Sequence, residues 1–162
     1  MMKKIISALL ALTMVFALVA CGSNGGQSQT EAPDLQAYYD DFMASLGDNA
    51  PMMMAIEGDM LESAYPGLSD YTLKQSVLQM AGISAVAFEM ALVETESEED
   101  AQAVEEIFQA RVDSQIQGGA MYPATIEAWE NASVLVEGCV VALIVAGEDQ
   151  TAAVDAFNAL FA

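Results

Sequence analysis

The sequence predicts a single small α+β domain in which helices pack on one face of an antiparallel sheet. Residues 83–93 alternate apolar with small or polar side chains, as in a strand with one buried face. Residues 133–146 contain two apolar, β-branched runs separated by Glu137-Gly138, which is a hairpin signal. Residues 97–117 and 149–160 show helical spacing, so the order is strand, helix, strand, strand, helix.

Residues 1–20 have the layout of a secretory signal peptide. Lys3 and Lys4 precede an apolar run from Ile5 to Leu18, and small residues lie near its exit. This run is shorter than the roughly 20 residues that a membrane-spanning helix needs. We therefore exclude these residues from the predicted fold.

The segment ends in Leu18-Val19-Ala20-Cys21-Gly22, which resembles a bacterial lipobox. That resemblance implies diacylglyceryl transfer to the Cys21 sulfur, cleavage before Cys21 and a lipidated N-terminus. Two or more acyl chains on one cysteine anchor a protein stably. The residues after it, through Pro33, are rich in Gly, Ser and Gln and predict a flexible linker. Residues 21–33 are thus expected to tether a domain to the outer face of the bacterial cytoplasmic membrane.

The folded domain is expected over residues 34–162. Asp34 is a candidate N-cap for a helix that ends near Leu46, where Gly47 follows as a stop. The interpretation of residues 51–80 stays open. An apolar run begins that segment, a possible helical turn follows, and the last ten residues fit either a strand or a helix.

The second half carries clearer signals. Ser97 is a candidate N-cap, and the three acids that follow it suit the positive end of the helix dipole. This helix is expected to run to about Gln117 and to end at Gly118-Gly119. The run Val140–Val145 is apolar on both faces, which predicts a central position in the sheet.

Composition excludes several classes of function. Asp and Glu outnumber Lys and Arg by 24 to 4, and histidine is absent. After removal of residues 1–20 the cations are Lys74 and Arg111, which argues against nucleic acid as a partner and against contact with anionic lipid. The lack of histidine removes the Ser-His and Cys-His nucleophile systems and the usual zinc sites. We expect no cofactor, no metal and no enzymatic activity.

Several short motifs follow one another in residues 65–161. They are Ala87-Phe88-Glu89, Arg111-Val112-Asp113-Ser114-Gln115, Tyr122-Pro123, Asn131-Ala132, Gly138 and Val140-Val141-Ala142-Leu143. Together with the lipobox, they resemble the bacterial lipoproteins that carry domain of unknown function 4358. The chain departs from that pattern at Gly118-Gly119-Ala120-Met121 and at Cys139. The resemblance implies a lipid-anchored extracytoplasmic α+β domain and provides no catalytic residues.

Arg111 and Gln115 are the candidate site residues of the domain. They fall within or beside the core-facing stripe of the helix predicted over residues 97–117. Side chains in such a stripe are normally apolar, so two polar residues there indicate a specific role. The apolar members of this stripe are Val104, Ile107, Phe108, Val112 and Ile116. No carboxylate lies three or four residues from Arg111, so its partner must come from another element.

Two roles are open for this pair. Arg111 and Gln115 either grip a ligand at the mouth of a pocket, or tie down residues 122–131 through carbonyl groups or Glu127. We favour the structural role, because the guanidinium fork has five donors and suits the pinning of a loop. The Arg111 side chain is then expected to be covered and hydrogen-bonded inside the domain.

The leading functional hypothesis is a non-enzymatic lipoprotein whose domain binds a protein or an envelope ligand. A ligand- or cation-binding component of a transport or sensing system is the first alternative, and a hydrolase that uses carboxylates alone is the second. A flat apolar patch would favour the leading hypothesis, whereas a polar concave pocket with converging acids would favour the alternatives.

The lipobox generates a direct prediction for Cys21. The Cys21→Ala variant should not be acylated and should accumulate as an uncleaved precursor, because the acceptor sulfur is gone. Metabolic labelling with a radioactive fatty acid and an immunoblot of precursor and mature forms measure this. A variant that is processed and fractionates as the wild type does would contradict the lipoprotein hypothesis.

Overall fold

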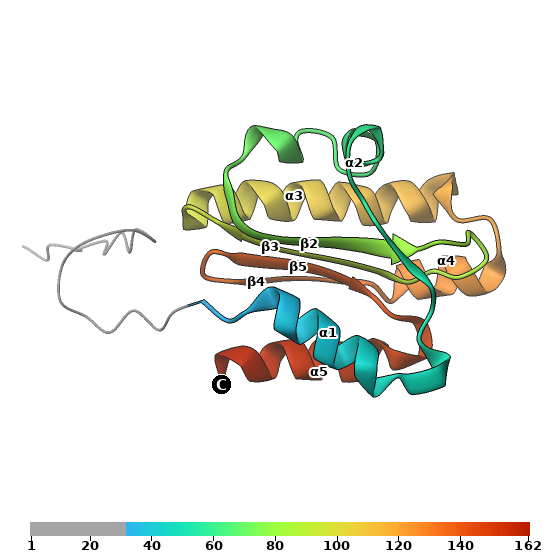
Figure 1. The fold of residues 1–162 in the computed structure, drawn as a ribbon. Helices are drawn as coiled ribbons and strands as arrows, with labels where there is room; N and C mark the ends of the chain where they lie inside the picture. Colours follow the sequence, from blue (N-terminus) through green and yellow to red (C-terminus); the bar gives the residue numbers. More distant parts are fainter. Residues whose placement is uncertain (1–31) are drawn as a thin grey trace, which may run out of the picture.

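The computed structural model describes residues 32–162, which form one α+β domain (Figure 1). The predicted class is confirmed, with a five-stranded sheet in which every neighbouring pair is antiparallel. The strands of this sheet are β1 Met53–Ala55, β2 Leu73–Ala81, β3 Glu89–Thr95, β4 Ser133–Glu137 and β5 Val140–Val145. The α-helices are α1 Leu35–Ser45, α2 Asp59–Ala64, α3 Glu98–Ser114, α4 Pro123–Glu130 and α5 Gln150–Asn158.

The sheet has the strand order β1-β2-β3-β5-β4. The predicted hairpin is β4–β5, with Glu137 opposite Val140 and a tight turn at Gly138, whose φ is +60°. β3 lies between β2 and β5, and β5 lies between β3 and β4. The central position predicted for Val140–Val145 is therefore confirmed.

Helices cover both faces of the sheet, which corrects the prediction that they pack on one face. α2, α3 and α4 lie on one face, and α1 and α5 lie on the other (Figure 1). The reason is that side chains on both faces of the central strands are buried. All six residues of β5 and all but one of the seven residues of β3 are buried. Strands that are apolar on both sides need cover on both sides.

The two predicted helix N-caps are confirmed. The Asp34 carboxylate accepts a hydrogen bond from the backbone N–H of Ala37 at 2.9 Å, and the Ser97 hydroxyl accepts one from Asp100 at 3.1 Å. Each contact satisfies an N–H group that has no partner within its own helix. α3 ends at Ser114, slightly before the predicted end, and continues as a single π-helical turn, η3 Gln115–Gly119.

The strand predicted over residues 83–93 begins later than expected. Residues 82–88 form the loop between β2 and β3, in which the Val86 N–H donates to the Ile83 carbonyl at 3.2 Å. The prediction that only one face of this strand is buried is also wrong, because side chains on both faces of β3 are buried. Glu89 and Ala91 are the small or polar members of the predicted alternation, and both are buried on the α3 side of the sheet.

The described chain enters the domain at one end of β2, and two loops meet at the other end. The Gln75 amide, near the start of β2, donates to the Pro33 carbonyl and accepts from the Leu35 N–H, both at 3.0 Å. The end of β2 and the connection between α3 and α4 line one cavity. Gln75 and Ala81, which lines the cavity, are six positions apart along β2, which corresponds to about 20 Å. We call the end with the cavity the distal end (Figure 1).

Candidate functional site

A buried ion pair between Glu89 and Arg111 lies at the distal end. Arg111 Nε donates to Glu89 Oε1 at 3.0 Å, and Arg111 Nη2 donates to Glu89 Oε2 at 2.8 Å. The Arg111 side chain is 12% exposed and that of Glu89 is 2% exposed. Two-point contact of this kind is the strongest geometry available to an Arg–carboxylate pair. It compensates both charges where water is largely excluded.

Aromatic side chains complete the surroundings of the pair. The Tyr65 hydroxyl donates to Glu89 Oε1, so this carboxylate accepts three hydrogen bonds. The Arg111 guanidinium lies 5.3 Å from the centre of the Trp129 ring and 6.0 Å from that of Tyr65. Both distances fall within the range of cation–π attraction. The cluster joins β3, α3, α4 and the residue that follows α2.

Local sequence explains how each member reaches the cluster. Glu89 is the first residue of β3 and points to the same face as Ala91, whose small side chain leaves room for α3. Arg111 lies one turn after Phe108, in the core-facing stripe of α3. Trp129 comes from the last turn of α4, which Pro123 begins. These residues lie on one face of the sheet because α3 and α4 pack there.

The environment shifts the pKa of two members of the cluster. Burial, and then the Glu89 carboxylate, raise the pKa of Tyr65 well above its ordinary value. Burial opposes the charge on Arg111, but hydrogen bonds and the ion pair with Glu89 outweigh this, so the Arg111 pKa is raised. The cluster therefore keeps Arg111 charged and Tyr65 neutral.

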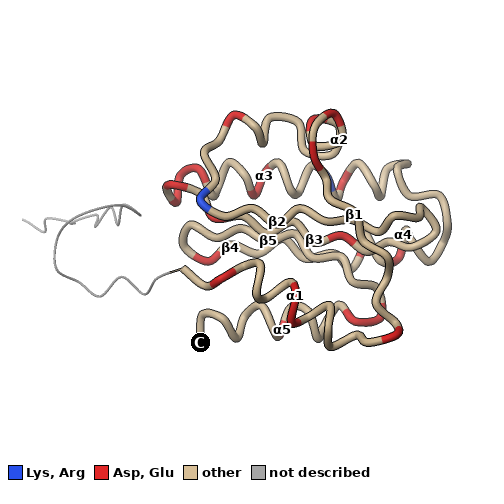
Figure 2. The backbone as a smooth tube through the Cα atoms, in the orientation of Figure 1, with Lys and Arg blue, Asp and Glu red and all other residues tan. Residues whose placement is uncertain are grey.

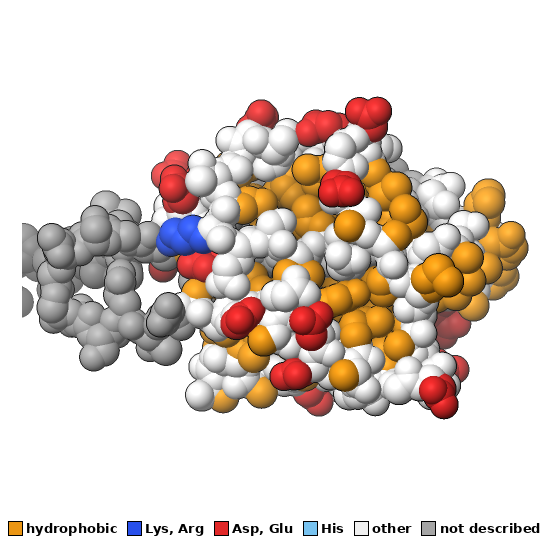
Figure 3. Space-filling view, in the orientation of Figure 1, with side chains coloured by type: hydrophobic (Ala, Val, Ile, Leu, Met, Phe, Trp, Pro, Cys, Tyr) orange, Lys and Arg blue, Asp and Glu red, His pale blue; other side chains and the backbone are white. Residues whose placement is uncertain are grey.

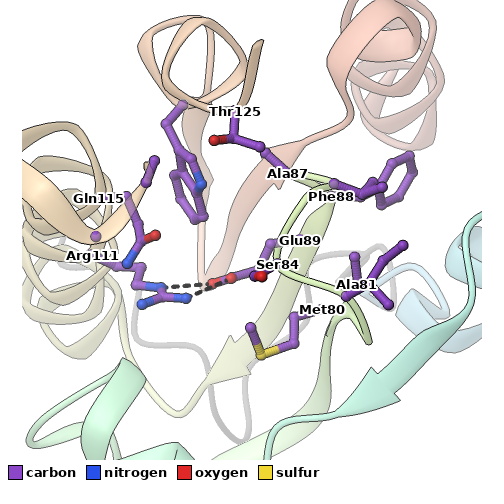
Figure 4. A pocket seen from close by; sticks show the side chains of 14 residues that line it. Met80, Ala81, Ser84, Ala87, Phe88, Glu89, Arg111, Gln115 and Thr125 are labelled. Atoms are coloured by element: carbon purple, nitrogen blue, oxygen red, sulfur yellow. Dashed lines mark hydrogen bonds and ion pairs between the residues drawn. The ribbon is translucent and has the colours of Figure 1, made fainter. Parts of the chain in front are cut away.

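Beside this cluster lies a small cavity of about 110 Å³. Figure 4 shows Arg111 and Gln115 on the α3 side of the cavity, Glu89 and Met80 on the sheet, and Ala87 and Phe88 on the β2–β3 loop. The Gln115 side chain lies across Gly119, where a Cβ atom would come within 2.4 Å of Gln115 Nε2. A glycine at position 119 thus lets Gln115 lie along the cavity wall.

The cavity offers hydrogen-bond donors. Arg111 Nη1 and the Gln115 amide make no hydrogen bond within residues 32–162, and no buried side-chain polar atom in that range lacks a partner. Both groups must therefore be accessible to solvent, and both residues line the cavity. By contrast, Thr125 Oγ1 is engaged with Tyr122, donating to its carbonyl and accepting from its N–H. An acceptor on a ligand would complete the site.

Exposed apolar side chains occur in the two segments that contribute to the cavity wall, residues 82–88 and 115–122. Met121 is 72% exposed, Ile83 is 60% exposed and Tyr122 is 49% exposed, and Val86 and Ile116 are exposed as well. We call these five residues the distal face. Figure 3 shows hydrophobic side chains projecting at this end of the molecule, away from the point where the described chain enters. Contiguous exposed apolar patches are one feature by which interaction sites are recognised.

The structure places the predicted candidates as follows. Arg111 is covered and hydrogen-bonded, but its partner is Glu89, not Glu127 or the carbonyl groups of residues 122–131. Gln115 lies beside it in the cavity wall. Cys21 lies outside the described residues.

Sequence reasoning missed Glu89, Tyr65 and Trp129 as members of the site. The available signal was the acid at position 89, the single charged residue in the otherwise apolar run of residues 85–93. An acid in such a run needs a cation, and Lys74 and Arg111 are the only ones after residue 20.

Within residues 32–162, no group of three or more His, Cys, Asp or Glu side chains is arranged to hold a metal ion. The same residues contain no helix that is long and apolar enough to span a bilayer. The cavity is lined by apolar side chains, by the donors of Arg111 and Gln115, and by the Glu89 carboxylate, which already accepts three hydrogen bonds.

The fold and site define a small α+β domain with a buried ion pair beside a donor-lined cavity. Residues 45–146 match the family described as Domain of unknown function (DUF4358), and the chain belongs to this family. Searches of curated proteins and of solved structures found no match.

The ion pair generates a prediction on stability. Arg111→Ala should lower the free energy of unfolding by about 2–4 kcal/mol, because it leaves the Glu89 charge buried without its partner. Urea denaturation followed by circular dichroism measures this. Arg111→Lys, the matched control, keeps the charge but not the two-point contact. Its free energy of unfolding should lie between those of the wild type and Arg111→Ala. An alanine variant as stable as the wild type would contradict the structural role.

The buried tyrosines generate a prediction on pH. Burial raises the pKa of both Tyr65 and Tyr38, whose hydroxyl donates to the Ala153 carbonyl at 2.8 Å. Above about pH 10 the unfolded chain loses these protons and the folded chain keeps them, so stability is full below that pH and falls as pH rises.

The free energy of unfolding should fall by up to about 1.4 kcal/mol per pH unit for each tyrosine. Unfolding free energies measured in urea between pH 8 and 11 test this. The double variant Tyr38→Phe/Tyr65→Phe should be less stable at pH 8 but should lose less between pH 9.5 and 11. An equal loss in both proteins would refute the assignment.

Proposed function

We propose that this chain is a bacterial lipoprotein, anchored through Cys21 at the outer face of the cytoplasmic membrane, whose domain binds another molecule through its distal face. The lipobox and the signal-like residues before it support the anchor. The single observation that carries the binding role is the group of exposed apolar side chains around the donor-lined cavity.

The position of the distal face supports this role. The described chain enters near Gln75 and Pro33, at the opposite end of β2. A domain held at that end presents the distal face away from the lipid. The excess of acids, which Figure 2 shows on both layers of the fold, also keeps the domain off an anionic membrane surface.

The two alternatives receive less support. A bound cation would need converging carboxylates, but Glu89 is the only acid among the described residues that line the cavity, and it already pairs with Arg111. A carboxylate-based hydrolase would need a carboxyl group free for proton transfer, whereas Glu89 already accepts hydrogen bonds from Arg111 and Tyr65.

Site-specific photocrosslinking in intact membranes tests the proposal. A benzoylphenylalanine at Met121 should yield a discrete adduct, because the distal face would contact the partner. The same group at Gln36, an exposed position near the chain entry, is the matched control and should not yield that adduct.

Adding Ile83→Asp to the Met121 probe should remove the adduct, because a charge would interrupt the apolar contact. If the probe at Met121 gives no adduct, or if both probe positions give the same one, the distal face is not the binding surface.

A further inference from the structure

We infer that the distal face recognises a polypeptide segment carrying apolar side chains next to Lys or Arg, and that the cavity receives an amide carbonyl of that segment. This inference rests on the proposed function and names the chemistry of the partner.

The size of the cavity favours a group that protrudes from a larger partner. Sites for small molecules usually have volumes of about 300–1,000 Å³. The cavity beside Arg111, at about 110 Å³, holds only a few heavy atoms. The remaining contact area must come from the exposed side chains around it, chiefly Ile83, Met121 and Tyr122.

The unengaged N–H donors favour a hydrogen-bond acceptor on the partner, and the local charge favours an uncharged acceptor. Arg111 Nη1 and Gln115 Nε2 are unengaged within residues 32–162 and suit a carbonyl oxygen. Arg111 is already neutralised by Glu89 at 2.8 Å, so a carboxylate would meet no net positive charge. An amide carbonyl accepts the same hydrogen bonds without opposing Glu89.

The charge around the distal face selects a basic partner. The two loops that form it, residues 82–88 and 115–122, contain no charged residue. The exposed charges on the adjoining helices are acidic: Asp113 on α3, and Glu127 and Glu130 on α4. Lys74 lies near the start of β2, at the end where the described chain enters (Figure 2).

Lys or Arg beside the apolar contacts of a partner would therefore meet complementary charge, which raises the association rate and disfavours acidic partners. A second copy of this chain would bring acids against acids. An anionic lipid surface is disfavoured for the same reason.

Selection from a displayed library of random peptides tests the inference, because it needs no identified partner. The full-length chain in mild detergent is the bait, and the Met121→Asp variant is the background bait. Enriched sequences should combine apolar residues with Lys or Arg. Enrichment of acidic sequences, or no enrichment over the variant, would overturn the inference.

Trp129, the only tryptophan in the chain, lines the cavity and reports its occupancy. The most enriched peptide, synthesised with capped ends, should change its fluorescence in a saturable way. Gln115→Glu keeps the shape, removes the N–H donors and adds a negative charge. Binding should weaken about tenfold, as expected for the loss of a hydrogen bond inside a contact.

Gln109→Glu is the charge-matched control at an exposed position of α3, the helix that η3 continues, and it gives up only the surface hydrogen bond that Gln109 donates to Asp113. It should leave binding unchanged or slightly tighter. Equal behaviour of the two variants would show that the cavity does not receive the acceptor.

Raising the salt concentration from about 0.05 to 0.5 M should weaken binding severalfold. A dimer of this chain that Met121→Asp disperses would assign the distal face to a second copy and overturn the inference. These outcomes differ from a failure of the proposed function, in which the Met121 probe captures nothing in membranes.

Discussion

The ion pair between Glu89 and Arg111 is the interaction on which the distal end of this domain depends. The Glu89 carboxylate is buried and the Arg111 side chain is largely covered, so either charge alone would carry a desolvation penalty. Together they satisfy one another through two hydrogen bonds, and Tyr65 adds a third to the same carboxylate. Because the guanidinium fork and the carboxylate are both planar, the contact sets where the last turns of α3 lie over the start of β3.

Several features of the distal end follow from this placement. α3 is held far enough along the sheet for its π-helical extension to reach over the β2–β3 loop, with Gln115 lying across Gly119. Trp129 packs against the guanidinium and brings α4 to the same corner. The space left between these parts is the cavity, so a structural ion pair forms one of its walls. The structural and pocket roles considered for Arg111 are therefore compatible.

The pair also shapes the charge of the surface. One of the two cations after residue 20 is withdrawn into the interior, and the other, Lys74, lies 3.6 Å from Glu94 near the start of β2. The distal face is left apolar, with acids on the helices beside it. In the proposed function this combination gives selectivity: apolar contacts supply affinity, while the acids disfavour acidic partners and anionic lipid.

The sequence by itself determined the features that depend on near neighbours. The caps at Asp34 and Ser97, the turn at Gly138 and the apolar run of β5 each involve residues within a few positions of one another. The α+β class follows from their order. The α3 stripe also indicated, correctly, that Arg111 would need a partner from outside its own helix.

Only the tertiary structure decided which partner that is. Glu89 lies 22 residues before Arg111, and its face of β3 is buried because α3 packs over it. Helical cover on the second face, the start of β3 at Glu89 and the strand at Leu73–Ala81 likewise depend on contacts between distant segments. The Tyr38 hydroxyl, which bonds a carbonyl 115 residues away, is an example. Local patterns report hydrophobicity and backbone preference, but the pairing of buried charges depends on which elements the fold brings together.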